Sequence, residues 1–120
     1  MSISIIGGSV SPSTALTLNA HTGTTYTFVL TDANNTLVTA SNASAQTYTI
    51  PPNSSVAYPI GSQINIIAIG AGQVSFAQGS GVTIASNGAT STAPKLRVQY
   101  SSASAVKVNT DSWYVIGDIS

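Results

Sequence analysis

The side chains that could perform acid–base or metal chemistry are few, and their spacing does not bring them together. The 120-residue chain has one histidine, His21, three aspartates and no cysteine. A retaining glycosidase needs two carboxyl groups about 5 Å apart, but Asp111 and Asp118 flank one expected strand and would be more than about 20 Å apart in extended backbone. Without cysteine, no disulfide, thiol nucleophile or cysteine-based zinc site can form. His21 has no carboxylate near it in sequence, which is typical of a surface or capping residue rather than a general base.

The glycine- and asparagine-rich motifs are better explained by turns than by ligand binding. Asp32-Ala-Asn-Asn35 resembles the start of a calcium-binding loop, but Leu37 and Ala43 occupy the positions of its glycine and its terminal glutamate. Gly70-Ala-Gly72 predicts a hairpin turn, and no helix follows it that could bind phosphate. The serines lack the G-x-S-x-G motif of a nucleophile elbow. The sequence therefore predicts no catalytic, cofactor-binding or metal site, and a protein that is not an enzyme.

Ionised side chains make up only 5% of the chain, against about 25% in ordinary soluble domains. They are Lys95, Arg97, Lys107, Asp32, Asp111 and Asp118. The net charge is zero, so no electrostatic attraction toward nucleic acid or an anionic membrane is expected. No stretch approaches the ~20 apolar residues of a membrane helix, and the N-terminus lacks the cationic start and long apolar run of a secretion signal. A surface with so few charges promotes association with other molecules. We therefore expect partners to cover much of the surface.

The stretch from Ile50 to Ile84 carries the pattern on which the fold prediction rests. Short runs of β-branched residues alternate there with glycine-rich turns, which is typical of consecutive antiparallel strands. Similar runs occur on both sides, at 24–30, 36–39, 46–50, 95–100, 105–108 and 113–116. We therefore predict an all-β fold, a compact antiparallel β-sandwich or barrel of about 9–10 short strands. No segment keeps a helical spacing of apolar residues, so no long helix is expected.

Alternation along these runs predicts which side chains face the interior. In 95–100, Leu96, Val98 and Tyr100 share one face, and in 105–108 the two valines point inward. The expected core consists of large apolar side chains from six runs: Phe28, Ile64, Ile66, Phe76, Val98, Val106 and Trp113.

The regular strand pattern begins only after Asn19, which divides the chain into two parts. Residues 1–20 are expected to form an N-terminal arm or edge strand, and residues 21–120 a single β domain. Within the first part, Ser2–Ile6 alternates like a short strand and carries no charge. Such a segment suits either the edge of the domain's own sheet or the addition of a strand to a neighbouring molecule.

A set of short motifs, each present once, follows a particular order from about Tyr26 to Ser120. They are Val29–Ala33, Leu37-Val38, Ser41–Ala43, Ile50–Ala57, Pro59–Ile64, Gly70–Val74, Gly79–Ile84, Lys95–Arg97, Gln99–Ser101 and Trp113–Asp118. In this order they resemble a module found in the structural proteins of tailed bacteriophages. The resemblance covers roughly four-fifths of the chain.

The resemblance implies a non-enzymatic virion protein, often a homotrimer and often placed at the end of a long tail fibre. Only some twenty residues precede the module here, which favours a stand-alone component over a fibre. We therefore expect a head decoration (cement) protein, assembled in the host cytoplasm, that binds between subunits of the major capsid protein on the outer surface of the capsid. The alternative is a tail-fibre or receptor-binding tip that contacts a host glycan, with tyrosines such as Tyr48 or Tyr58 as stacking platforms.

Overall fold

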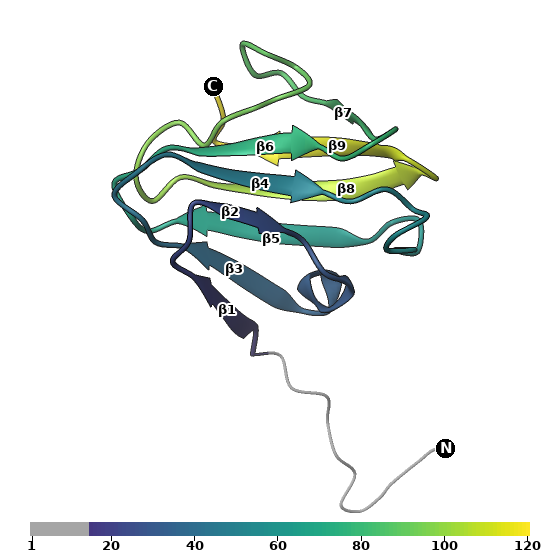
Figure 1. Ribbon diagram of the computed structural model, residues 1–120, viewed down its shortest axis with the longest axis horizontal. Coiled ribbons are helices and arrows are strands. Elements are labelled where there is room, and N and C mark those ends of the chain that lie inside the picture. Colours follow the sequence, from purple (N-terminus) through teal and green to yellow (C-terminus); the bar gives the residue numbers. More distant parts are fainter. Residues whose placement is uncertain (1–14) are drawn as a thin grey trace, which may run out of the picture.

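The computed structural model describes residues 15–120, which form two β-sheets packed face to face (Figure 1). The large sheet has six strands in the order β1-β3-β5-β8-β9-β7, and the small sheet has three in the order β2-β4-β6. The elements are β1 (Thr17–His21), β2 (Thr25–Thr27), the 3-10 helix η1 (Leu30–Ala33), β3 (Thr36–Ala40), β4 (Gln46–Ile50), β5 (Gln63–Ala68), β6 (Val74–Gln78), β7 (Thr83–Ala85), β8 (Ser102–Asn109) and β9 (Ser112–Gly117).

The first six strands wind through both sheets as three stacked rungs. Rung 1 consists of β1 and β2, rung 2 of β3 and β4, and rung 3 of β5 and β6, so the chain crosses from the large sheet to the small sheet in each rung. Successive rungs pair in parallel in both sheets. The rest of the chain completes the large sheet: β8 pairs antiparallel with β5 and with β9, and β7 lies parallel to β9.

The all-β prediction is confirmed, but the predicted antiparallel arrangement is wrong. Strand accounts for 46% of the structure, about twice the usual 20–25%, and residues 15–120 contain nine strands and no α-helix. Five of the seven strand pairs among these residues are parallel. The turns between the early strands connect two sheets rather than neighbours in one sheet, and side chains alternate in the same way in both arrangements.

The corners between the sheets also stack on one another. The Gly72 N–H donates to the Asn42 carbonyl oxygen (2.8 Å), and the Asn42 side-chain amide donates to the Thr22 carbonyl oxygen of rung 1 (2.7 Å). A Cβ atom added to Gly72 would overlap the Ser44 carbonyl oxygen, and one added to Gly70 would overlap the backbone of Asn42. Gly70-Ala-Gly72 is therefore a corner that needs glycine for close backbone approach, and not the predicted hairpin turn.

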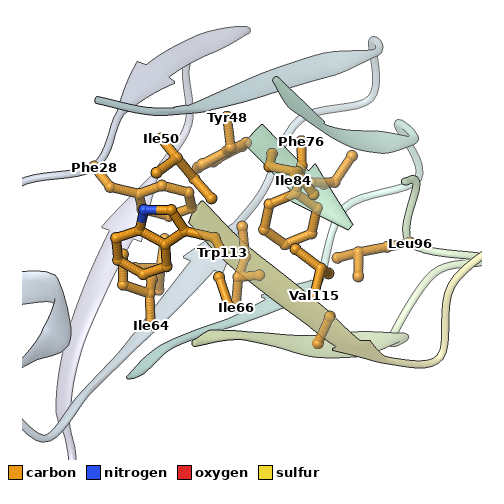
Figure 2. Close-up of a cluster of buried hydrophobic side chains, with 14 of the residues drawn as sticks. Phe28, Tyr48, Ile50, Ile64, Ile66, Phe76, Ile84, Leu96, Trp113 and Val115 are labelled. Carbon is orange, nitrogen blue, oxygen red and sulfur yellow. The ribbon is translucent and has the colours of Figure 1, made fainter. Parts of the chain in front are cut away.

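The hydrophobic core fills the space between the two sheets. Five of the seven predicted members lie in it, each at most 2% exposed: Phe28, Ile64, Ile66, Phe76 and Trp113 (Figure 2). Tyr48, Ile50, Ile84, Leu96 and Val115 are buried with them. Because the rungs are in register, like residues stack across neighbouring strands, as Val38 does beside Ile66 and Tyr48 beside Phe76.

The other two predicted core residues, Val98 and Val106, lie outside the core. In β8 it is Lys107 that faces the interior, whereas Val106 is half-buried and Val108 is exposed. Residues 95–100 form two isolated bridges instead of the predicted strand, and Val98 is 52% exposed. The predicted inward face of β8 is therefore shifted by one residue, which reverses the direction of every side chain in the strand.

The described part of the predicted N-terminal segment 1–20 is an edge strand. Residues 17–20 belong to β1, which pairs with β3 at one end of the large sheet and continues one residue past the predicted boundary. The predicted strand Ser2–Ile6 lies outside the described residues. Among residues 15–120, no helix is long and apolar enough to cross a membrane.

Candidate functional site

The two ends of the rung stack differ in how their strand edges are covered. Rung 1 supplies the edge strand of both sheets at one end, β1 in the large sheet and β2 in the small sheet (Figure 1). Within residues 15–120, no strand pairs with the outer side of either one. We call this end the open end, defined by Thr17–His21 and Thr25–Thr27.

The opposite end is closed in both sheets. In the small sheet, the edge of β6 is covered by a loop, because the Phe76 N–H donates to the Pro94 carbonyl oxygen and the Leu96 N–H donates to the Val74 carbonyl oxygen, each at 2.9 Å. In the large sheet, β7 is only three residues long. The backbone N–H of Ile84, in the middle of β7, donates to the side chain of Gln78 (2.8 Å). Short edge strands and covered edges are the usual protections against pairing with another chain.

The hydrogen bonds of rung 1 show which backbone groups face outward. The Thr17 N–H donates to the carbonyl oxygen of Asn35, the residue before β3 (2.9 Å). The His21 carbonyl oxygen accepts from the N–H of Ser41, the residue after β3 (2.9 Å). Because successive residues of a strand direct their N–H and C=O groups to opposite sides, Leu18 and Ala20 direct theirs away from β3. The edge carries no charge and no proline, so it is suited to strand addition by an extended segment of a partner.

In the small sheet the same reasoning applies to β2. The Thr24 carbonyl oxygen accepts from Thr47 (2.8 Å), and the Phe28 N–H donates to Thr49 (3.0 Å). The intervening residues that face outward are therefore Thr25 and Thr27. Both are exposed, and threonine is favoured in strands. The open end thus presents two parallel backbone edges, one in each sheet.

Behind the open end, a buried carboxylate holds rung 1 together. Asp32, 1% exposed, accepts hydrogen bonds from the Tyr26 hydroxyl (2.6 Å), the Asn19 side-chain amide (2.7 Å) and the Val29 N–H (2.9 Å). Both carboxylate oxygens are thereby used within the protein. The Asp32 turn is therefore a structural centre that fixes η1 against rung 1.

His21 lies beside this carboxylate cluster but is not part of its hydrogen bonds. Its ring packs against Tyr26 with 3.7 Å between ring centroids. Burial, reinforced by the hydrogen bond to Asp32, raises the pKa of Tyr26 to about 12, so this tyrosine stays neutral at physiological pH. His21 therefore packs on Tyr26 at the end of the rung stack.

Lys107 is the second buried charge, and it fixes a loop rather than a ligand. Its ammonium group donates to the Asn53 side-chain oxygen and to the Tyr58 carbonyl oxygen, each at 2.7 Å. Tyr58 in turn donates its hydroxyl to the Val29 carbonyl oxygen (2.7 Å) and packs edge-on against Trp113 at 5.2 Å. Lys107 therefore ties the loop after β4 to the core.

The remaining charges leave little free electrostatic potential on the surface. Arg97 and Asp118 form an exposed ion pair at 2.7 Å. Hydrogen bonds from Arg97 and Ser101 hold the pKa of the Asp118 carboxyl below its usual value. Asp111 accepts from the backbone N–H of Asn53 (2.8 Å). Asp111 and Asp118 stand at opposite ends of β9, as expected, and the structure does not bring them together as a pair.

Of two hollows on the described surface, neither contains a set of catalytic groups. The larger, of about 430 Å³, lies between η1 and the loop before β5, lined by Leu30, Thr31, Ala33, Asn34, Ala57, Pro59 and Ser62. The smaller, of about 230 Å³, has Lys95 as its one titratable side chain. Among residues 15–120, no group of three histidine, cysteine or acidic side chains is placed to hold a metal.

The tyrosines proposed as glycan platforms do not reach the surface. Tyr48 is fully buried and Tyr58 is 3% exposed, so that part of the sequence interpretation is wrong. The exposed tyrosines are Tyr100 (68%) and Tyr114 (52%). Tyr48 and Tyr114 lie in strands, where exposure depends on which face meets the second sheet, whereas Tyr58 and Tyr100 lie in loops. Alternation in the sequence does not distinguish the buried tyrosines from the exposed ones.

The buried tyrosines make stability sensitive to alkaline pH. Burial raises the pKa of Tyr48 to about 12, so its contribution is complete below pH ~10 and is lost as the pH rises toward ~12. Tyr48→Phe removes this ionisation and only a weak 3.5 Å hydrogen bond to Gln46. We expect the variant to lose less stability above pH ~10, by up to about 1.4 kcal/mol per pH unit. Urea unfolding between pH 8 and pH ~11.5 measures this.

Tyr100→Phe is the control for that experiment, because Tyr100 is exposed and lies outside the core. This variant should keep the alkaline stability curve of the unmodified protein. An unchanged curve for Tyr48→Phe would show that Tyr48 is accessible to solvent in the folded protein.

Most motifs of the phage-module resemblance lie in corners, loops and the closing strand. Gly70–Val74 forms a corner, and Ile50–Ala57 forms the loop held by Lys107. Trp113–Asp118 includes most of β9. No protein-family model, curated protein or solved structure matches the chain. The resemblance therefore rests on these residues alone.

Proposed function

We propose that this protein is a structural component of a tailed-bacteriophage virion, without enzymatic activity. Its most specific form is a head decoration (cement) protein on the outer surface of the capsid. There it would bind between subunits of the major capsid protein and stabilise the shell. The motif order from Tyr26 to Ser120 supports the virion assignment, and the open end of the rung stack supports docking by strand addition.

The observation that carries the proposal is the difference between the two ends of the stack. The closed end uses a covering loop and a side-chain cap besides the very short β7. The open end has neither a covering loop nor such a cap among residues 15–120, although β2 is as short as β7. Natural sheets that stay monomeric protect their edges. The uncovered edges of β1 and β2 therefore fit a protein whose edges are covered by a partner, here an extended segment of a capsid subunit.

The charge distribution supports the same mode of binding. Two of the six ionised side chains, Asp32 and Lys107, are buried, and Arg97 is paired with Asp118. Binding must therefore come from backbone hydrogen bonds and apolar contact. Many weak contacts repeated over a shell can still give firm attachment, and such binding should depend little on salt.

The alternative is a tail-fibre or receptor-binding tip that contacts a host glycan. Tyr100 and Tyr114 are the exposed aromatic side chains that could stack on a sugar. Electron microscopy of labelled virions separates the two functions by copy number. Hundreds of copies over the head support decoration, and a few copies at the tail would favour the tip.

A proline in the open edge tests the docking route. Ala20→Pro removes an outward N–H and leaves intact the bonds that Thr17 and His21 make toward β3. Proline is tolerated at such edge positions. We expect the folded variant to bind capsids that lack the protein at least about tenfold more weakly, as one backbone hydrogen bond and close approach are lost. Co-sedimentation with capsids at several protein concentrations measures the affinity.

Ala20→Ser is the matched control, since it keeps the backbone N–H, and it should bind as the unmodified protein does. Circular dichroism and urea unfolding confirm that both variants are folded. Equal binding by Ala20→Pro and Ala20→Ser would exclude the open edge as the docking site. Failure of the unmodified protein to bind capsids at all would instead contradict the decoration function.

A further inference from the structure

The outer face of the large sheet, which points away from the core, carries no charged residue. Alternation along its strands and the pairing register assign its members: Leu18, Ala20, Leu37, Thr39, Gln63, Asn65, Ile67, Thr83, Ala85, Ser102, Ser104, Val106, Val108, Ser112, Tyr114 and Ile116. A sheet face in water normally carries charged side chains on many of these positions. Here large apolar side chains stand on it instead, Leu18 at 67%, Ile116 at 61% and Tyr114 at 52% exposure.

One row of this face runs straight across five strands. The register places Leu18 beside Leu37, Leu37 beside Asn65, Asn65 beside Ser104 and Ser104 beside Ile116. The row therefore has aliphatic side chains at both ends and polar side chains near its middle, with Asn65 of β5 at the centre.

Polar side chains in and beside the middle of the row form hydrogen bonds with one another. The Asn65 side-chain oxygen accepts from the Ser104 hydroxyl (2.6 Å) and from the Gln63 amide (2.9 Å). The same Gln63 amide lies 3.2 Å from the Ser104 hydroxyl oxygen. Polar groups that are bonded to one another lose less free energy when water is removed than unpaired ones. This face can therefore be covered by another surface at low cost.

We propose that a second copy of this chain covers the face, related by a two-fold axis that runs nearly along β5. Such an axis places the β1 end of the row in one copy opposite the β9 end in the second copy. Leu18 of one copy therefore meets Ile116 of the second copy, and the same contact forms at the other end of the row. Two-fold interfaces pair one patch with itself in this way. Sheets of like twist pack face to face with strand directions about 30° apart, which the arrangement allows.

The size of the face is sufficient for a stable pair. The five longer strands, about 4.8 Å apart, span roughly 24 Å, and their five to eight residues are roughly 17–27 Å long. These strands therefore give the face an area on the order of 400–650 Å², to which the three-residue β7 adds a little, and this approaches the ~800 Å² that each partner buries in a standard interface. The open end is smaller, since it offers two strand edges of five and three residues.

The proposal differs from the homotrimer that the phage resemblance implies. A flat patch that covers its own copy closes after two molecules, whereas a threefold ring needs two different complementary patches on each molecule. The two-fold pair also leaves the edges of β1 and β2 accessible at the side of the interface. Self-association through the face and docking through the edge can therefore occur in one particle.

Charged substitutions at the two ends of the row test the pairing. Ile116→Glu alone and Leu18→Lys alone each place a charge against an aliphatic side chain of the second copy, and each should weaken dimerisation at least about tenfold. The double variant Leu18→Lys/Ile116→Glu should recover much of the lost affinity, because opposite charges then meet across the interface. Within one chain these positions are four strand spacings apart, roughly 19 Å, beyond the screening length of about 8 Å at physiological salt.

Sedimentation equilibrium of the purified full chain, without capsids, measures the dissociation constant of the pair. Ile60→Glu is the matched control, because Ile60 has the same 61% exposure as Ile116 but lies in the loop before β5. It should dimerise as the unmodified protein does. A dimer, weakened by each single variant and recovered in the double variant, is the expected result.

A monomer at all concentrations, or a trimer, would overturn the proposal. A dimer that is insensitive to Ile116→Glu, or weakened equally by Ile60→Glu, would show that another surface forms the pair. Capsid binding is measured separately with the proline variant. Because Ala20 also borders this face, sedimentation equilibrium of Ala20→Pro should show an unchanged dimer, which keeps the two tests apart.

Discussion

Replacing Gly72 with alanine is expected to destabilise the protein by about 3–5 kcal/mol, a large part of the 5–15 kcal/mol that holds a typical domain together. The added Cβ would overlap the carbonyl group of Ser44. Because both groups belong to stacked corners, no side chain can move aside to relieve the overlap. The rungs would have to separate, which also breaks the bond from the Gly72 N–H to Asn42 (2.8 Å). Overpacking of a rigid site normally costs 1–3 kcal/mol, and more where backbone must shift.

Urea unfolding followed by circular dichroism measures this cost. Gly23→Ala is the control, since the nearest atom to its Cβ would be the Thr25 carbonyl oxygen at an ordinary 3.7 Å. That variant should stay within about 0.5–1 kcal/mol of the unmodified protein. If Gly72→Ala were equally mild, the corners of rungs 2 and 3 would not be in contact, and the parallel stack would be wrong.

Trp113→Ala is expected to cost about 3–5 kcal/mol, as for other large aromatic side chains removed from a core. Trp113 is 2% exposed and packs edge-on against Tyr58, so its loss leaves a cavity between β9 and the loop held by Lys107. Val98→Ala is an informative control, because the sequence pattern places Val98 in the core and the structure exposes it at 52%. It should change the unfolding free energy by no more than about 0.5 kcal/mol.

The same urea titration distinguishes the two interpretations of the sequence. A large loss for Val98→Ala would restore the predicted strand at 95–100. A small loss for Trp113→Ala would mean that the tryptophan lies on the surface and that β9 does not cover the core.

Most strand positions could be predicted from the sequence, residues 95–100 being an exception, but the partners of the strands could not. Alternation of apolar and polar residues reports which residues of a strand share a face, and Phe28, Ile64 and Phe76 were placed correctly on that basis. Alternation does not report whether the next strand pairs beside it or crosses to the opposite sheet. Gly70-Ala-Gly72 suits both a hairpin and a stacked corner, so the parallel pairing of the rungs could not be predicted from it.

The error in β8 has a physical cause that concerns the outer face. Hydrophobicity assigns Val106 and Val108 to the interior, yet the interior face of this strand consists of small alanines and Lys107. The rule fails where the outward face is the more apolar one. That is the expected pattern for a sheet that is buried on both sides, in agreement with the proposed pair of copies.

The candidate site was only partly accessible to sequence reasoning. Weak edge protection follows from the uncharged β1 segment, which the sequence places at an edge or in an arm. The cluster around Asp32 was missed because Asn19, Tyr26 and Asp32 meet only through the winding of rung 1. A buried aspartate with no nearby cation in sequence resembles an ordinary turn residue.

The winding of the chain also fixes the order in which the molecule can be completed during synthesis. The three rungs emerge from the ribosome first, but β5 stays uncovered on one side until β8 (Ser102–Asn109) has been made. Trp113 follows later still. A nascent or truncated chain that ends before Ser102 therefore exposes apolar sheet faces and free edges, which are the features that drive aggregation. Completion of the last two strands is thus the step that covers the free edge of β5 and the apolar faces of the rungs.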